Sequence, residues 1–291
     1  MDTLIINVLN ALLYASILFL IAGGLSLIYG VMRIVNLAHG GLYAIGAYVA
    51  AWSVGLLAAQ VPVGVLFLVL PVGAVAAGLA GALIEPTLLK PLYRRAEEYQ
   101  LLITFGLFLV LEDAIRFLWG AQPLSATTLW AALGSLEFLG AIYPVYNLLV
   151  IVVGIVTAML VWAFVYRTRF GVVLRATSQD RKMAAALGVD VKRVYLQAFT
   201  IGCFMAGLGG AVIVPSQAAV LGMGVDALVL SFVVVVIGGL GSLEGALVGA
   251  LIVAFVREAG INWFPEIELA ILYLIAAAVL LVRPAGLFGR A

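Results

Sequence analysis

A few polar side chains interrupt the long apolar stretches of this chain. Asn36 and His39, the only histidine, follow the first stretch, and Glu112 and Arg116 lie further along. Ionisable groups in such surroundings are costly to keep and are therefore candidates for function. No nucleophile stands beside His39, and one histidine with one cysteine, Cys203, cannot supply the ligand shell of a metal. We therefore expect neither enzymatic activity nor a bound metal or cofactor.

Each of these polar groups has a structural interpretation beside a functional one. Asn36 can cap a second helix while His39 lies among lipid headgroups, or both can line the inner mouth of a passage between helices. Glu112 and Arg116 have the i,i+4 spacing of an ion pair on one helix. The alternative for that pair is contact with a protein outside the membrane.

A later stretch is interrupted by glycines, with a serine and an acid close behind. These residues are Gly238, Gly239, Gly241, Ser242 and Glu244. Ser242 can cap a helix that follows the break. Backbone groups left unpaired here must be covered by protein or water, because lipid offers no hydrogen bonds. The alternative is that the glycines allow close packing of helices.

Membrane-spanning helices are the elements that must position these residues. An apolar run of about 20 residues crosses about 30 Å of hydrocarbon. Stretches close to that length are 4–30, 37–59, 61–84, 101–119, 146–166 and 195–214, followed by a shorter one at 269–282. The stretch 227–256 is too long for one helix, and two arms that enter the membrane and return, 228–237 and 242–256, are favoured over one kinked helix. The sequence thus predicts an all-α integral membrane protein, a polytopic bundle of about 8 transmembrane segments in a single domain over 1–291.

The composition agrees with a protein immersed in lipid. Hydrophobic residues make up 66% of the chain and charged residues 10%, and the mean hydropathy is +1.25. Soluble domains are about a quarter charged. The net charge of +1 excludes a nucleic-acid partner, which would require a basic face. The N-terminal stretch has no basic leader and is not expected to be a cleaved signal peptide.

The positions of lysine and arginine predict the orientation, because these residues collect on the cytoplasmic side. With the N-terminus outside, the connections that fall inside contain Arg33, 90–95 and 167–193. The C-terminal Arg283 and Arg290 also fall inside if 227–256 returns to the side that it left. Arg116 and Arg257 are then the exceptions. We expect the N-terminus outside and the C-terminus in the cytoplasm.

The cytoplasmic connection 167–194 predicts a short helix outside the membrane. It carries seven basic and two acidic residues. Thr177 or Ser178 can cap the N-terminus of this helix, Asp180 lies in its first turn, and Gly188 suits its end. A helix of about ten residues is unstable alone in water. It therefore either docks on a cytoplasmic partner or lies at the headgroups.

The same connection resembles the ATPase-contacting loop of the branched-chain amino-acid ABC permeases, through RATSQDRKMAAALGV at 175–189. Three other stretches resemble that family in the same order: YGVMRIVNLAHGG at 29–41, GGLGSLEGA at 238–246 and LVRPAGLFG at 281–289. The early NLAHG is similar to the LivH-type subunit rather than to its LivM-type partner. The chain departs from the family at Glu244, where a proline is common.

The resemblance implies a permease subunit of a binding-protein-dependent importer of leucine, isoleucine and valine in the bacterial inner membrane. It implies as partners a homologous LivM-type membrane subunit, two cytoplasmic ATP-binding subunits and a periplasmic substrate-binding protein. The sequence contains no Gly-x-x-x-x-Gly-Lys-Ser/Thr loop for nucleotide. Similar importers carry urea, amides or aromatic acids, and an ion-coupled secondary transporter is the alternative class.

The resemblance also implies roles for two groups of residues. Those that couple to the ATPases are Arg175, Gln179, Asp180, Arg181, Ala184, Ala185 and Gly188, with Ala184, Ala185 and Gly188 forming the face of close contact. The candidates for the translocation pathway are Asn36, His39, Gly238, Gly239, Gly241, Ser242 and Glu244.

Overall fold

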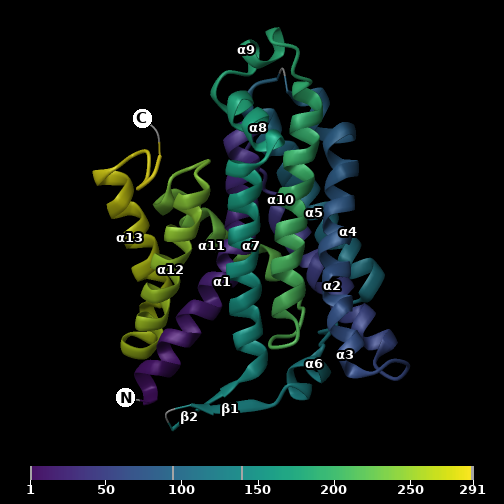
Figure 1. Cartoon of the computed structure of the whole chain (residues 1–291), viewed down its shortest axis with the longest axis vertical. Helices are drawn as coiled ribbons and strands as arrows, with labels where there is room; N and C mark the ends of the chain where they lie inside the picture. Colours follow the sequence, from purple (N-terminus) through teal and green to yellow (C-terminus); the bar gives the residue numbers. More distant parts are fainter. Residues whose placement is uncertain (1, 94, 139, 290–291) are drawn as a thin grey trace.

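A computed structural model describes residues 2–93, 95–138 and 140–289 as a bundle of long helices (Figure 1). The longer helices are α1 (Asp2–Met32), α2 (His39–Leu57), α4 (Leu70–Ile84), α5 (Glu97–Trp119), α7 (Val145–Arg167), α8 (Arg169–Gln179), α10 (Val191–Ile213), α11 (Met223–Gly238), α12 (Leu243–Trp263) and α13 (Glu268–Val282). The shorter elements are α3 (Val63–Leu66), η1 (Phe67–Val69), η2 (Glu85–Leu89), η3 (Lys90–Leu92), α6 (Thr127–Ala132), α9 (Arg181–Ala186) and η4 (Pro265–Ile267). A small antiparallel hairpin, β1 (Ser135–Phe138) and β2 (Ala141–Pro144), lies outside the bundle at one end.

The prediction of a polytopic all-α membrane protein is confirmed, whereas the count of about eight spans is not. Among the described residues, six segments are long and apolar enough to cross a membrane: Thr3–Met32, His39–Leu57, Val63–Leu92, Val145–Arg167, Val191–Ile213 and Pro265–Val282. The bent pair of α11 and α12 raises the number to at most seven. α5 is 23 residues long and packs against α2, but Glu112, Asp113 and Arg116 make its second half too polar to count on composition.

The predicted break in the stretch 227–256 is present as a sharp reversal of the chain. The axes of α11 and α12 differ by 115°. Gly239 and Gly241 at the bend have φ of +108° and +81°, a region that residues with a Cβ avoid. The arms are longer than predicted, 16 and 21 residues, because α11 already begins at Met223 and α12 continues as a helix beyond the apolar run, through Arg257 to Trp263.

The connection between α1 and α2 turns back into the bundle. α1 ends at Met32, and Arg33 has a φ of +57°. Residues 34–38 are non-helical and mostly buried, and α2 begins at His39 in contact with the carbonyl of Ile21. Ile21 lies about three turns before the end of α1, or about 16 Å along its axis. α2 therefore begins deep within the bundle, beside the middle of α1.

Glycines bring the central helices into backbone contact. α10 packs against α1, α2 and α4. A Cβ built on Gly46 of α2 would lie 2.2 Å from the carbonyl oxygen of Gly207 in α10, and one on Gly73 of α4 would lie 2.2 Å from that of Gly46. Such approach gains dispersion contacts, which replace the hydrophobic driving force that is missing between helices in lipid.

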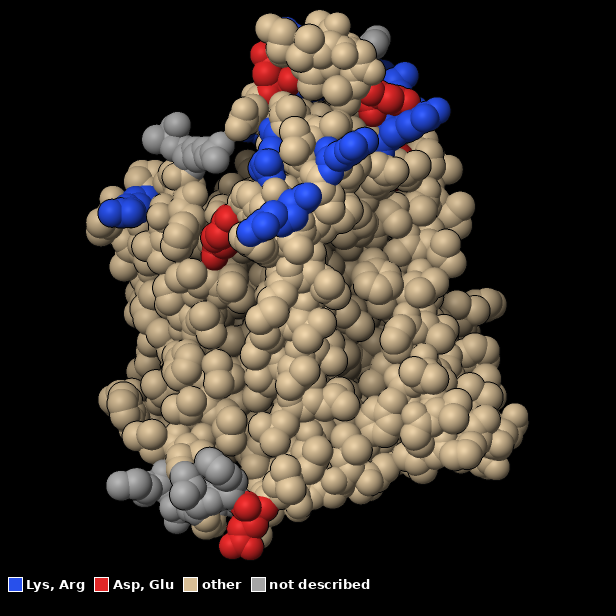
Figure 2. Space-filling model, in the orientation of Figure 1, with Lys and Arg blue, Asp and Glu red and all other residues tan. Residues whose placement is uncertain are grey.

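On the face shown in Figure 2, the lysine and arginine side chains lie toward one end of the molecule. We call the end that carries α8 and α9 the basic end; the N-terminus lies at the other, which we call the opposite end (Figure 1). Much of the surface between the ends is apolar, including Leu83, Leu102 and Leu160, which are all exposed. The predicted cytoplasmic Arg94 and Arg290 lie outside the described residues.

Candidate functional site

The connection at the basic end contains two helices, α8 and α9, where the sequence predicted one. Thr168 caps α8 by accepting a hydrogen bond from the backbone N–H of Gly171 at 3.0 Å. A Cβ on Gly171 would lie 2.2 Å from the carbonyl oxygen of Val165, so glycine is needed where α7 turns into α8. α8 continues to Gln179 and therefore includes Thr177 and Ser178, which do not cap the second helix as predicted.

Asp180 is the residue that caps α9. Its Oδ1 accepts hydrogen bonds from the backbone N–H groups of Lys182 and Met183, at 2.8 and 2.9 Å. α9 is six residues long, shorter than the ten predicted, because the extended backbone of Asp180 separates it from α8. Gly188 ends the turn with a φ of +88°, as predicted for a C-terminal glycine.

The exposed residues of α9 differ in part from the close-contact face that the resemblance implied. Ala184 is only 4% exposed and packs into the protein, so it supports the helix from within. Ala185 and Gly188 are exposed, as predicted. Met183 and Leu187 stand out beside them, 58% and 78% exposed. The tip of the connection therefore presents two large apolar side chains to solvent.

Arg175 anchors α8 to α7. Its Nη1 donates a hydrogen bond to the carbonyl of Val165, and its guanidinium lies 5.0 Å from the ring centre of Tyr166. These contacts are internal, so Arg175 positions the connection.

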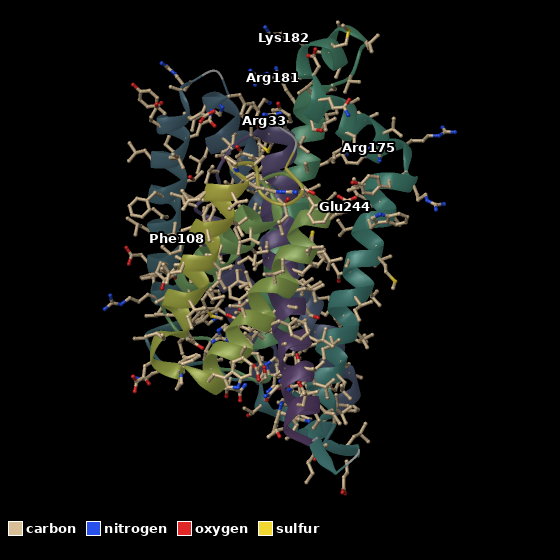
Figure 3. All side chains as sticks on the ribbon, turned by 90° about the vertical axis from the view of Figure 1, so that its left-hand side faces the viewer. Arg33, Phe108, Arg175, Arg181, Lys182 and Glu244 are labelled. Carbon is tan, nitrogen blue, oxygen red and sulfur yellow. The ribbon has the colours of Figure 1, made fainter. Side chains whose placement is uncertain are left out.

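A cavity of about 450 Å³ lies between this connection and the ends of α1, α5 and α10. Gln179, Asp180 and Arg181 line it from the connection, with Arg33 and Arg95 on the facing wall. Figure 3 shows Arg33, Arg181 and Lys182 at the same end of the molecule. The predicted coupling residues thus lie together at the basic end, except that Ala184 is turned inward.

Asn36 and His39 are both fully buried, which contradicts the structural interpretation of each. The cap position of α2 is Ala38, and no side chain caps it, so Asn36 does not act as a cap. His39 Nε2 lies 3.0 Å from the carbonyl oxygen of Ile21, well inside the bundle and away from any headgroup. Among the described residues, Nδ2 and Oδ1 of Asn36 and Nδ1 of His39 have no hydrogen-bond partner. Buried polar atoms without a hydrogen-bond partner are uncommon in folded proteins, so each calls for an explanation.

The glycine break is covered by other parts of the chain. Ser26 donates from Oγ to the carbonyl of Ser242 at 2.9 Å, and a Cβ on Gly241 would lie 2.8 Å from Cα of Gly30. The backbone N–H groups of Leu287 and Phe288 donate to the carbonyls of Ile237 and Gly238, each at 2.9 Å. A Cβ on Gly239 would lie 2.4 Å from the backbone nitrogen of Gly289. The break therefore has the close packing that was weighed as the alternative to an open cavity.

Ser242 caps α12 as predicted, by accepting from the N–H of Gly245 at 3.0 Å. Glu244 is exposed in the first turn of α12, where the helix dipole stabilises an acid. Gly30, which contacts the break, is about 13 Å along α1 from Ile21, which contacts His39. The predicted pathway residues thus form two separate groups: Asn36 and His39 beside the middle of α1, and the residues of the break beside its end.

The predicted ion pair between Glu112 and Arg116 is not formed. Oε1 of Glu112 instead accepts a hydrogen bond at 2.5 Å from the N–H of Gly222, just before α11. Nearby, a Cβ on Gly40 would lie 2.1 Å from the carbonyl oxygen of Gly224, so the N-termini of α2 and α11 meet inside the bundle. Helix periodicity could not find this junction, because it joins residues far apart in the chain.

Comparison with known proteins agrees with this architecture. Residues 7–282 match the family described as "Branched-chain amino acid transport system / permease component". The high-affinity branched-chain amino acid transport system permease protein BraD of Pseudomonas aeruginosa is 28% identical to this chain. The alignment covers 98% of this chain and 95% of the relative. The corresponding LivH of Salmonella typhimurium is 28% identical, with 97% of this chain and 94% of the relative covered. The probable branched-chain amino acid transport permease protein LivH of Methanocaldococcus jannaschii is also 28% identical, with 96% of this chain and 91% of the relative covered. The chain belongs to the family of branched-chain amino acid transport system permease components.

Proposed function

We propose that this chain is the LivH-type membrane subunit of a binding-protein-dependent ABC importer that carries leucine, isoleucine and valine into the cell. The observation that carries the proposal is the apolar tip of the basic end. Met183 is exposed on a six-residue helix and Leu187 directly after it, and this helix is capped by Asp180 and supported by the buried Ala184. The family and the names of its relatives give the class of solute.

In the assembly that we propose, the chain pairs with a LivM-type membrane subunit, two cytoplasmic ATP-binding subunits and a periplasmic binding protein. The segment 167–194 is the coupling loop, and α9 enters a groove of an ATP-binding subunit. The ATP-binding subunits hydrolyse the nucleotide and the chain described here is not catalytic. The basic end faces the cytoplasm, in line with the enrichment of lysine and arginine there, so the N-terminus lies outside.

Uptake should depend strictly on the ATP-binding subunits. In cells that express the complete importer, deletion of their genes is expected to reduce uptake of labelled leucine to the background of cells lacking the importer. The control restores the ATP-binding subunits on a plasmid. Uptake that persists without them, and that follows an ion gradient instead, would favour a secondary transporter and overturn the proposal.

We also propose that Asn36 and His39 line the pathway, whereas Gly238, Gly239 and Gly241 pack the break against neighbouring backbone. The support is clearest for Asn36, which has 0% exposure and two side-chain atoms without a hydrogen-bond partner in the described structure. An unsatisfied buried polar group destabilises a fold by about 1–3 kcal/mol. A role in transport explains why an amide is kept at such a position.

Asn36→Leu is therefore expected to separate stability from function. The thermal midpoint of the purified protein should stay the same or rise, because an unsatisfied amide is replaced by an apolar side chain of similar size. Leucine uptake should fall by about tenfold, the effect of roughly 1.4 kcal/mol. Ser231→Ala is the control, because Ser231 is equally buried but its Oγ bonds locally to the carbonyl of Leu228. A lower midpoint with unchanged uptake would assign Asn36 a purely structural role.

A further inference from the structure

A second cavity, of about 420 Å³, lies toward the opposite end of the molecule. Tyr14 of α1, Arg257 of α12 and Glu268 and Tyr273 of α13 form one side of it, and Met223 at the start of α11 lies on another. α1, α12 and α13 converge near the N-terminus, as Figure 1 shows. Cavities that bind small molecules in proteins usually measure about 300–1,000 Å³. The space is therefore suited to a small solute.

Charged groups of both signs meet in this cavity. Nη2 of Arg257 lies 3.9 Å from Oε1 of Glu268, which is an ion pair but is too long for a hydrogen bond. The guanidinium carbon lies 4.1 Å from the ring centre of Tyr14, so the guanidinium makes a cation–π contact with this ring. The side chains of Arg257 and Glu268 are 28% and 19% exposed. Asp226 adds a second carboxylate to the lining.

The pair of Arg257 and Glu268 has hydrogen-bonding capacity that the described part of the chain does not use. Nε of Arg257 and Oε2 of Glu268 are buried, and neither has a hydrogen-bond partner there. A buried ion pair is stable only when its remaining donors and acceptors are satisfied. Paired arginine and carboxylate groups frequently take the parallel two-bond geometry, which Arg257 and Glu268 do not. The open pair instead leaves one donor set and one acceptor set free for a ligand.

The other walls of the cavity are aliphatic. Ile17, Leu18 and Ile21 of α1 face it on one side, and Ile213 and Leu230 on another. A ligand that satisfies this site needs a carboxylate for the guanidinium, a cationic nitrogen for the carboxylates, and an apolar body. A free aliphatic α-amino acid carries all three within a few bonds.

We propose that this cavity is an amino-acid binding site within the membrane subunit itself. The carboxylate of the ligand binds Arg257, its ammonium group binds Glu268 and Asp226, and its side chain packs on the aliphatic walls. This inference rests on the proposed function, because it assumes that the solute released into the chain is a free amino acid. It adds that the membrane subunit recognises both charged ends of the solute.

Protection of a cysteine from labelling tests the site directly. The reconstituted complex, without nucleotide, carries Cys203→Ala and Gln217→Cys, because Gln217 lines the cavity and the native Cys203 is buried. Leucine at ten times its dissociation constant should slow labelling by a small thiol reagent about tenfold. Isocaproate, which lacks the ammonium group, and isopentylamine, which lacks the carboxylate, should protect far less. Equal protection by isopentylamine would show a cation site, and no protection by leucine would show that the cavity is not a binding site; either result overturns the proposal.

Arg257→Gln in the same background should raise the leucine concentration needed for half protection about tenfold, the loss expected for one hydrogen bond to a charged group. Lys90→Gln is the control, because Lys90 is exposed near the basic end and does not line the cavity. The ATP-binding subunits should still co-purify with Arg257→Gln. Failure of the proposed function would appear as ATP-independent uptake, whereas failure of this inference leaves ATP-dependent uptake intact and removes only the protection. Unchanged protection in Arg257→Gln would contradict the assigned role of the arginine.

Discussion

Leu187→Asp is expected to abolish uptake while the chain stays folded in the membrane. Leu187 is 78% exposed at the tip of α9, so its replacement disturbs no internal packing. Burial of a leucine in an interface stabilises it by about 1.5–3 kcal/mol, and an aspartate in its place would also have to lose its water. Each 1.4 kcal/mol corresponds to a factor of ten in affinity. We therefore expect binding of the ATP-binding subunits to weaken at least about a hundredfold.

Co-purification of the ATP-binding subunits with the tagged chain, followed by leucine uptake in cells, measures this effect. Leu136→Asp is the matched control, because Leu136 is 53% exposed in β1 at the opposite end, far from α9 (Figure 1). The control should retain the ATP-binding subunits. If Leu187→Asp also retains them at wild-type levels, α9 is not the docking element.

Gly46→Val is expected to prevent assembly of the bundle. A Cβ at Gly46 would lie 2.2 Å from the carbonyl oxygen of Gly207 and 2.4 Å from its Cα, and both of these atoms belong to the backbone of α10. The other side of Gly46 is closed as well, since its own carbonyl oxygen faces Gly73 of α4. A side chain here must push whole helices apart. Overpacking a core destabilises it by about 1–3 kcal/mol when side chains can yield, and we expect a larger loss where backbone atoms are in the way.

The yield of monodisperse protein after detergent extraction, and its thermal midpoint, measure the loss. Gly55→Val in the same helix is the control, because nothing lies within 4 Å of a Cβ built there. We expect Gly55→Val to behave like the wild type, which separates the clash from the change in helix propensity. A stable Gly46→Val protein would mean that α2 and α10 are not packed in backbone contact.

Local signals in the sequence predicted much of this structure. The apolar runs located the long helices, since a helix in lipid needs only length and composition to be stable. Gly188 and Ser242 were correctly assigned as a helix end and a helix cap, because capping depends on residues within one turn. The reversal near Gly239 was predicted from the length of the apolar stretch, the glycines that interrupt it and the placement of the C-terminal arginines.

Tertiary structure alone decided the environment of the polar side chains. The sequence left open whether Asn36 and His39 act as a helix cap and a headgroup residue or line a passage, and the connection after Arg33 turns inward and buries them beside α1. The face that α9 offers also depends on what lies beneath it, and the inward turn of Ala184 leaves Met183 and Leu187 outside.

Arg257 shows the limit of sequence analysis most clearly. By charge placement it was an exception to the positive-inside pattern. In the structure it meets Tyr14, more than two hundred positions earlier in the chain, and Glu268 of the following helix. Periodicity and composition report how each segment meets lipid or water. The partners of a buried charge depend on which segments pack together, and that is settled by shape and by the close approach of glycine-lined helices.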